Sequence, residues 1–251
     1  LWNEIGRGTD LQALDAWIDE NQRALDALTA AVFASQPPRW TDYFDPQTID
    51  LDEAKAGQAL FAQRCAHCHG TYEKGWDAAD AADRAPVDRL ATTRVVYHAQ
   101  TPVFEVGTDP GRRDGQAALH QLIASLHIYT KHGIQSVVPD GYVPPPLDGV
   151  WARYPYLHNN SVPTLCALLS PVAERPVTFR QGPSESEADF DADCVGYPVG
   201  DAIPEAWAQI EDSLFDTRKP GLSNAGHDER IWGGPLRADE RRALVTFLKT
   251  L

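Results

Sequence analysis

The sequence predicts a mainly α protein with long irregular loops. Two observations support this prediction: apolar residues recur at helical spacing in three separate stretches, and few segments alternate between apolar and polar residues as strands do. With 251 residues, of which 43% are hydrophobic and 23% charged, the chain is long enough to bury its own core. No run of about 18 apolar residues is present, so we expect no membrane-spanning segment.

The N-terminal part of the chain is expected to form one long helix. Thr9 is a candidate cap, and Pro37 and Pro38 stop the helical pattern. The apolar residues of this stretch fall near one helical face: Leu11, Leu14, Ile18, Leu25, Leu28 and Val32. We therefore predict an added N-terminal helical extension over residues 1–50 and a larger domain over residues 51–251.

Two further helices are predicted near the two ends of the larger domain. One starts around Asp52 and runs into the segment CAHCH at 65–69. Its apolar side carries Ala56, Leu60 and Phe61. The other covers 238–251, where acidic residues come early and a lysine comes late, as the helix dipole prefers. Its apolar face is formed by Ala243, Leu244, Phe247, Leu248 and Leu251.

Between these helices the chain is predicted to be mostly irregular. From 70 to 149, Gly, Pro and Asp are frequent and periodicity is poor, apart from a helical stretch near 116–127. The prolines at 144–146 predict a stiff, extended connector. The stretch SVPT at 161–164 can cap and open a short helix that runs to Leu169, and a further helical piece is expected near 204–214.

The charge of the chain restricts its partners. There are 22 Lys and Arg against 36 Asp and Glu, which gives a net charge of −14. This charge repels nucleic acids, so we expect no nucleic-acid binding and a basic docking surface on a protein partner. Part of the acidity lies in 184–193, which has no basic residue. We interpret this segment as a solvated loop, with weak calcium binding as the alternative, although the spacing and glycine of an EF-hand are absent.

The segment CAHCH contains Cys65, Cys68 and His69. Covalent haem attachment needs two thiols roughly one helical turn apart and a following histidine that binds the iron. A zinc site would need a second closely spaced ligand pair, but Cys166 and Cys194 lie far along the chain and far from one another. A thioredoxin-like dithiol would follow a strand, which is not predicted here. The pattern therefore predicts one covalently attached haem c, with His69 as proximal ligand.

Gly57 and Phe61 lie on the helix that leads into this motif. A glycine on that face permits the close approach of another helix, and Phe247 of the terminal helix is the natural partner. A glycine that is merely tolerated there would cost about 1 kcal/mol relative to alanine. Crossed N- and C-terminal helices of this kind resemble the cytochrome c fold, so we expect a cytochrome c-like helical haem domain.

The remaining two cysteines and the absence of methionine indicate the cellular compartment in which we expect the protein. Cys166 and Cys194 could form a disulfide worth roughly 3.5 kcal/mol, with two free buried thiols as the alternative. Haem c assembly takes place on the exported side of the membrane. The chain contains no methionine, so we expect that it starts on a processed or truncated segment from which an export signal has been removed. Together these points favour a periplasmic or secreted location.

The absence of methionine also removes the usual distal ligand of electron-transfer haems. The second face of the iron must then carry a histidine, another side chain, water or nothing. The candidate histidines are His98, His120, His127, His132, His158 and His227, whereas His67 would be strained by its place inside the motif. Composition alone does not choose among them.

Four ordered segments carry a resemblance to a known family. They read VGTDPGR at 106–112, PLDGVWARYPYLHNNSVPTL at 146–165, RPVTFRQG at 175–182 and PGLSNAGH at 220–227. Together with CAHCH they resemble the C-terminal haem domain of the di-haem cytochrome c peroxidase superfamily, in its rubber-oxygenase-like branch. The resemblance extends from about residue 51 to the end of the chain, and the first 50 residues fall outside it.

The resemblance implies roles for individual residues. In that branch the histidine of the Asn-x-Gly-His segment is the distal ligand of a bis-histidine haem that passes electrons, and this position is His227. His158 matches a histidine that shapes the haem pocket, and it is the second candidate ligand. Trp151, Arg153 and Tyr156 are expected to line the pocket or to hydrogen-bond the haem propionates. For Trp151 and Tyr156, core packing is the alternative.

The chain departs from the family in one respect. The family's enzymes carry two C-x-x-C-H motifs, one haem for peroxide or substrate chemistry and one for electron relay, whereas this sequence has one motif. We therefore expect a mono-haem electron carrier with redox partner proteins and assign no catalytic residue. The alternatives are a peroxidase- or oxygenase-like oxidoreductase with an open distal iron site, and an electron-relay subunit of a larger complex. The resemblance also leaves Ca²⁺ open, because some relatives hold it between their haem domains.

Overall fold

The computed structural model of the chain describes residue 8 and residues 10–100, 102–131 and 133–251. The chain divides into two compact units. The smaller unit combines the residues up to 37 with residues 112–139, and the larger unit combines residues 38–111 with residues 140–251. The domain boundary expected at residue 50 stays a prediction. No helix of the described residues is long and apolar enough to cross a membrane.

The smaller unit contains two helices where one long helix was expected. They are α2 (Leu11–Glu20) and α3 (Gln22–Ala34). Asn21 separates them, because its side-chain amide donates to the carbonyl of Trp17 at 2.8 Å, and its backbone leaves the helical conformation at φ −105° and ψ 10°. Asp10 caps α2, and the expected cap Thr9 lies outside the described residues. The helical stretch expected near 116–127 is found as α7 (Gly111–Ala124) and α8 (His127–Lys131).

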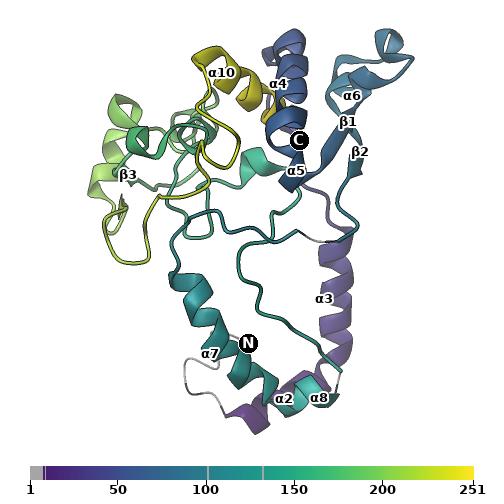
Figure 1. The fold of residues 1–251 in the computed structure, drawn as a ribbon, viewed down its shortest axis with the longest axis vertical. Helices are drawn as coiled ribbons and strands as arrows, with labels where there is room; N and C mark the ends of the chain where they lie inside the picture. The colour runs from purple at the N-terminus through teal and green to yellow at the C-terminus, as the bar shows by residue number, and fades with distance from the viewer. Residues whose placement is uncertain (1–7, 9, 101, 132) are drawn as a thin grey trace. The chain divides into compact units, whose positions relative to one another are not determined.

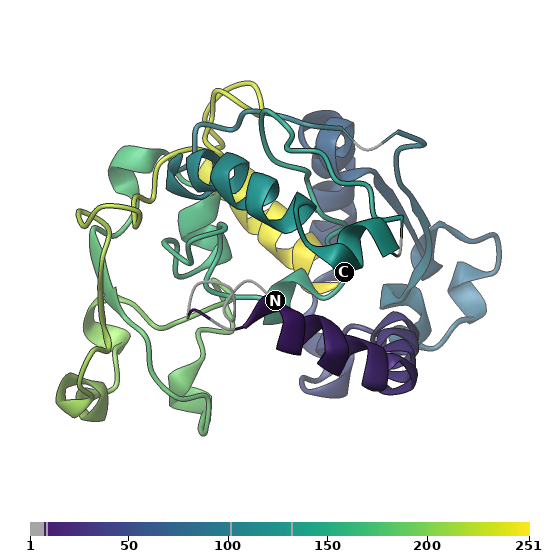
Figure 2. The ribbon, with the colours of Figure 1, turned by 90° about the horizontal axis from the view of Figure 1, so that it is seen from below.

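The larger unit is built around two helices at its sequence ends, α4 (Leu51–Arg64) and α10 (Ala238–Lys249), as expected. They lie side by side in both ribbon views (Figures 1 and 2). Gly57 makes this contact possible, because a Cβ atom at Gly57 would lie 2.0 Å from the carbonyl oxygen of Ala243. Next to that contact the rings of Phe61 and Phe247 lie 5.3 Å apart, centroid to centroid. The mainly α fold is therefore confirmed.

The other elements of the larger unit are short. The helices are α5 (Ala66–His69), α6 (Pro86–Leu90) and α9 (Leu165–Leu168). The strands form two antiparallel pairs, β1 (Thr71–Lys74) with β2 (Thr92–Val96) and β3 (Thr178–Arg180) with β4 (Leu214–Asp216). Single 3₁₀ turns cover Trp40–Asp42, Pro46–Thr48, Gly75–Asp77, Ala81–Asp83, Val150–Ala152, Val172–Glu174, Glu187–Asp189, Gly200–Ala202 and Glu205–Gln209.

Two local expectations need correction. The helical piece expected near 204–214 is only the 3₁₀ turn Glu205–Gln209, and the chain then enters β4. The segment 184–193 is exposed from 184 to 188 as expected, but Asp189 is buried. Its carboxylate accepts hydrogen bonds from the Ser186 amide at 2.8 Å and from the Trp207 indole N–H at 3.1 Å. Burial acts to raise the pKa of Asp189, but these hydrogen bonds lower it on balance.

Lys74 is a buried cation at the end of β1, with 1% of its surface exposed. Its ammonium donates to the Thr92 hydroxyl at 2.9 Å and to the backbone carbonyl of Thr250. That carbonyl follows the end of α10, where carbonyls have no helical partner. The ammonium also lies 5.4 Å from the centre of the Trp76 ring. Lys74 therefore ties the β1–β2 pair to the C-terminal end of α10.

Replacement of Lys74 by methionine should remove a pH-dependent part of the stability. Burial lowers the pKa of Lys74 from 10.5 to about 7, although Asp148 and Asp77 act to raise it. Between these two values the unfolded chain binds more protons at this site, so stability should rise with pH in the parent. Urea unfolding at several pH values should show this rise, up to about 1.4 kcal/mol per pH unit, reduced in Lys74→Met. The exposed Lys55 supplies the control Lys55→Met; parallel curves for parent and Lys74→Met would contradict the prediction.

Candidate haem site

The segment 65–69 places the thiols of Cys65 and Cys68 and the imidazole of His69 on a single helical turn. α4 ends at Arg64, and the amides of Cys68 and His69 both donate to the carbonyl of Cys65, at 3.1 and 3.0 Å. The turn ends at Gly70, which adopts φ +74°. A Cβ atom on Gly70 would lie 2.5 Å from the carbonyl oxygen of Val96, so only glycine fits this close approach to β2. Cys65 and Cys68 are both free thiols.

The acidity of these thiols argues against thiol–disulfide exchange. Burial raises the pKa of Cys65 to about 12, and burial also raises the pKa of Cys68. A redox dithiol instead needs a depressed pKa that supplies thiolate near neutral pH. The raised pKa values therefore give no support to a redox dithiol at this pair.

His69 is oriented by the proline connector that the sequence predicts. Its Nδ1 lies 3.1 Å from the carbonyl oxygen of Pro145. A carbonyl can only accept, so Nδ1 carries the proton and Nε2 keeps its lone pair for a metal. Burial lowers the pKa of His69, which favours the neutral, ligating imidazole. The neighbouring Pro144 and Pro146 carbonyls accept from Tyr97 and Arg153, respectively, and fix the connector on either side.

His227 faces His69 from a distant part of the sequence. The two ring centroids lie 6.2 Å apart. Burial, and the proximity of His69 and Arg175, lower the pKa of His227 to about 4, so this imidazole is also neutral near pH 7. Its buried Nδ1 atom has no hydrogen-bond partner among the described residues. The ring of Trp232 lies 5.2 Å from that of His227 and covers it on one side.

This geometry fits a haem iron between the two imidazoles. Two histidines bound to one metal from opposite sides hold their ring centres about 6 Å apart, given metal–nitrogen bonds of about 2 Å. The observed 6.2 Å agrees with that separation. Cys65 and Cys68 adjoin His69 on the same turn and are free to form thioethers. The residues present therefore match the donor set that haem c needs.

Arg175 fixes the loop that carries His227, and sequence reasoning did not single it out. It is 3% exposed, and its guanidinium donates only to backbone carbonyls among the described residues. Three of these carbonyls belong to the His227 loop: Asn224 at 2.6 Å, Gly226 at 2.8 Å and His227 at 2.8 Å. The other two are Leu168 at 3.1 Å and Ser170 at 3.4 Å. Its place at the start of the RPVTFRQG segment was the available signal.

The same loop is held by two of the other segments that carry the resemblance. The Asn159 side chain donates to the carbonyls of Gly221 and Ser223, at 3.1 and 2.9 Å. The His227 amide donates to the carbonyl of Val106 at 2.7 Å. A Cβ atom on Gly226 would lie 2.3 Å from the backbone carbonyl carbon of Gly107, so the loop and segment 106–112 touch through backbone atoms. The four segments quoted from the sequence thus meet around His227.

Two predicted pocket residues make contacts within the core. The indole N–H of Trp151 donates to the carbonyl of Pro38 at 2.9 Å, and its ring packs 5.4 Å from that of Trp40. The Tyr156 hydroxyl is directed at the carbonyls of Val150 and Val195, at 3.4 and 3.3 Å. These contacts account for both side chains as core residues. Their role at a haem stays a prediction.

The two other predicted residues lie in the same unit. The Arg153 guanidinium donates to the carbonyls of Pro146 and Asp148, so it supports the connector that orients His69. The ring of His158 stacks on that of Tyr142, with centroids 4.9 Å apart. Neither contact involves His69 or His227, and their expected role at the haem also stays a prediction.

The remaining histidines are placed as follows. His67 is exposed and its ring lies 6.2 Å from that of Phe104. His98 lies near enough to His69 to contribute to the lowered pKa of His69. His120 and His127 belong to the smaller unit, and His132 lies outside the described residues. Among the described residues no group of three or more His, Cys, Asp or Glu side chains could hold a metal, so Ca²⁺ stays an expectation.

Comparison with known proteins finds likeness to haem-binding domains in two parts of the chain. Residues 54–123 match the cytochrome c family model, and residues 141–180 match the model for RoxA-like, cytochrome c-like domains. Two proteins of Sinorhizobium fredii, y4iJ and y4iM, both described as uncharacterized, are each 33% identical to the chain. The first match covers 86% of this chain and 41% of y4iJ, and the second covers 82% of this chain and 50% of y4iM. The chain thus spans about half the length of these relatives or less.

Proposed function

Because this chain is a c-type cytochrome that resembles the RoxA-like haem domain, we propose that it relays single electrons through one bis-histidine haem c. A cytochrome c domain binds haem covalently and exchanges electrons with redox partners. Our proposal adds that a single haem is held between His69 and His227. The observation that carries it is the 6.2 Å separation of the two imidazole rings.

Two cysteines and two histidines would hold the haem. Cys65 and Cys68 would form the two thioethers, and His69 would bind through Nε2 while its Nδ1–H donates to Pro145. His227 would bind on the opposite face. The haem supplies one-electron exchange when bound. The lowered pKa values of His69 and His227 favour the neutral imidazoles, which together would close both faces of the iron to peroxide and oxygen.

Replacement of His227 by alanine should open one face of the iron. We expect a low-spin electron paramagnetic resonance spectrum in the oxidised parent and a predominantly high-spin spectrum in His227→Ala. Added imidazole should restore the low-spin form in that variant. His127→Ala, which removes an exposed histidine of the smaller unit, is the matched control and should keep the parent spectrum.

Two results would overturn the assignment. A high-spin parent would mean that no strong ligand closes the distal face. A parent that is low-spin and keeps that spectrum in His227→Ala would mean that another residue is the ligand, and His158→Ala would be tested next. A midpoint potential typical of histidine–methionine haems would also count against two imidazoles, which favour a lower value.

A second candidate function is a peroxidase- or oxygenase-like enzyme. The match to the RoxA-like domain over 141–180, which includes Arg153 and His158, favours it. In this alternative the distal iron site is open, and these two side chains assist proton movement or stabilise charge during cleavage of an O–O bond. Rapid peroxide-dependent oxidation of a reduced donor would support the alternative, and inertness to peroxide would contradict it.

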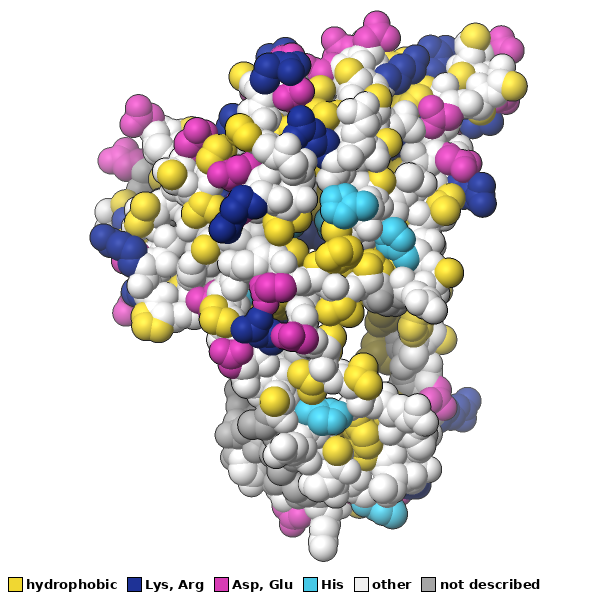
Figure 3. Space-filling view, in the orientation of Figure 1, with side chains coloured by type: hydrophobic (Ala, Val, Ile, Leu, Met, Phe, Trp, Pro, Cys, Tyr) yellow, Lys and Arg dark blue, Asp and Glu magenta, His cyan; other side chains and the backbone are white. Residues whose placement is uncertain are grey.

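The setting of the protein is also part of the proposal. The disulfide between Cys166 and Cys194 and the haem c motif support a periplasmic or secreted location. The net charge of −14 supports a redox partner with a basic docking surface. Acidic and basic side chains are interspersed on the face shown in Figure 3, so docking would use local charge complementarity there. The net charge and the N-terminal residues outside the resemblance fit membership of a larger electron-transfer complex equally well.

A further inference from the structure

Arg175 is a buried cation whose hydrogen bonds to the described residues all go to backbone carbonyls. It lies between the short helix α9 and β3, and it reaches both Leu168 at the end of α9 and the loop 220–228. This loop has no helix or strand of its own, so its carbonyls lack the partners that regular structure supplies. The planar guanidinium of Arg175 has five donors in a rigid fork, and it donates to the carbonyls of Asn224, Gly226 and His227.

The backbone at His227 needs this support. His227 adopts φ +44°, a left-handed conformation that is unfavourable for a residue with a Cβ atom. Such a conformation persists only where the surroundings hold it. Arg175 bonds the carbonyls of Gly226 and His227, on both sides of the Cα atom of His227, while Val106 accepts from the His227 amide. Arg175 therefore helps to hold the backbone from which the His227 imidazole projects.

Arg175 also brings a permanent charge to this place, because arginine keeps its proton in proteins. Asp228 and Glu229 act to raise the pKa of Arg175, which burial lowers, and Asp228 is already paired with Arg230 at 2.6 Å. The same positive charge helps to lower the pKa of His227. A fixed positive charge beside a redox iron favours the reduced state, which carries one positive charge less. It therefore raises the reduction potential.

We propose that Arg175 is a positioning residue for the iron centre, which aims the His227 imidazole through its carbonyl contacts and raises the reduction potential through its charge. This inference rests on the proposed role of His227 as distal ligand. Arg175 would then affect both the ligation of the iron by His227 and the reduction potential. Two different substitutions of Arg175 distinguish these effects. Arg175→Met removes the fork and the charge, whereas Arg175→Lys, compared at a pH low enough to protonate a buried amine (about 6), keeps the charge and loses the fork.

The test uses the haem-loaded protein. Electron paramagnetic resonance of the oxidised state reports ligation, and a redox titration reports the midpoint potential. Arg175→Met should contain a high-spin fraction that added imidazole converts to low-spin, and its low-spin form should have a lower potential. We expect at least a tenfold change in the ratio of reduced to oxidised protein at a given potential, which is about 59 mV for one electron. Arg175→Lys should show the high-spin fraction with a potential near that of the parent.

Arg180→Met is the matched control. Arg180 lies five positions further along the same segment, and its guanidinium donates to Trp207 and Ser213 rather than to the His227 loop. The control should keep the spectrum and potential of the parent. If Arg180→Met shifts both quantities as far as Arg175→Met does, the effect is not specific to the loop and the inference is wrong.

The outcomes separate this inference from the proposed function. If the parent is low-spin, His227→Ala is high-spin, and both Arg175 variants match the parent in spectrum and potential, then His227 is the ligand and Arg175 has no such role. If His227→Ala leaves the parent spectrum unchanged, the proposed function fails first. If Arg175→Met does not fold, Arg175→Lys decides: a parent-like spectrum without response to imidazole would overturn the positioning role.

Discussion

Replacement of Gly57 by alanine should destabilise the protein by about 3 kcal/mol or more, the largest effect that we expect from one methyl group. The added Cβ atom would lie 2.0 Å from the carbonyl oxygen of Ala243 and 2.8 Å from the Cβ atom of Phe247. The first of these is a backbone atom of α10, so the clash is relieved only if the two helices move apart. At an exposed helical site the same change would instead stabilise by about 1 kcal/mol. Urea unfolding followed by circular dichroism measures the difference.

Gly115 provides the matched control for this prediction. It lies within α7, and nothing is found within 4 Å of a Cβ atom built on it. Gly115→Ala should therefore keep or raise the stability, by up to about 1 kcal/mol. If Gly57→Ala were as stable as the parent, the close contact between α4 and α10 would not exist in solution. The cytochrome c-like arrangement of the terminal helices would then need revision.

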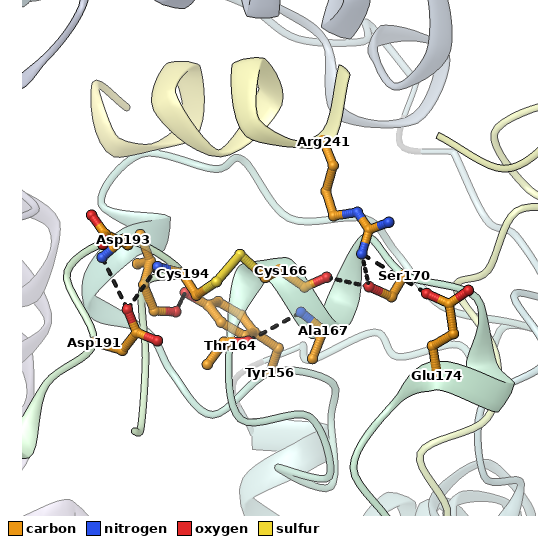
Figure 4. Close-up of a disulfide and its surroundings, with 11 residues drawn as sticks. Tyr156, Thr164, Cys166, Ala167, Ser170, Glu174, Asp191, Asp193, Cys194 and Arg241 are labelled. Carbon is orange, nitrogen blue, oxygen red and sulfur yellow. Dashed lines mark hydrogen bonds and ion pairs between the residues drawn. A yellow bond between two sulfur atoms is a disulfide. The ribbon is translucent and has the colours of Figure 1, made fainter. Parts of the chain in front are cut away.

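Removal of the disulfide between Cys166 and Cys194 should cost about 3.5 kcal/mol, because the bond closes a loop whose ends are 28 positions apart. The Cα atoms of the two cysteines lie 5.0 Å apart, and the Cys166 amide donates to the Cys194 carbonyl at 3.3 Å. Figure 4 shows the surrounding contacts. The Thr164 hydroxyl accepts from the amide of Ala167 in α9, and the Asp191 carboxylate accepts from the amide of Cys194. These contacts remain in the double variant Cys166→Ser, Cys194→Ser, so it should fold with a lower unfolding midpoint.

The control for the disulfide prediction is the response to reductant. Reductant should lower the midpoint of the parent to that of the double variant and leave the variant itself unchanged. Thioether bonds at Cys65 and Cys68 would not respond, because they are not disulfides. Equal midpoints for the oxidised parent and the double variant would contradict the prediction. A large effect would support a location where disulfides persist.

Local features were predictable because their causes lie close together in sequence. The spacing of Cys65, Cys68 and His69 within one turn indicates covalent haem, and helical periodicity predicts α4 and α10. The short helix expected after the stretch 161–164 is found as α9, with Thr164 as its cap. The prediction of one long N-terminal helix was wrong. The apolar pattern continues through Asn21, but the Asn21 side chain donates to the carbonyl of Trp17 in the preceding turn, and the helix is interrupted there.

The tertiary structure decided which histidine faces His69. Seven histidines besides His69 stand in the sequence, and composition treats them alike. The resemblance pointed to His227, but its approach to His69 depends on contacts between segments far apart in the chain, through Asn159, Arg175 and Val106.

The sequence by itself therefore determined the haem-binding turn and the helix that leads into it, since helical spacing and covalent attachment are local properties. Only the tertiary structure decided how that turn is completed. The carbonyl of Pro145 accepts from Nδ1 of His69, and side chains distant in sequence hold the His227 loop opposite His69 by donating to its backbone carbonyls. Which carbonyls accept depends on where the loops meet. Because every residue has a backbone carbonyl, the sequence does not show which of them will accept.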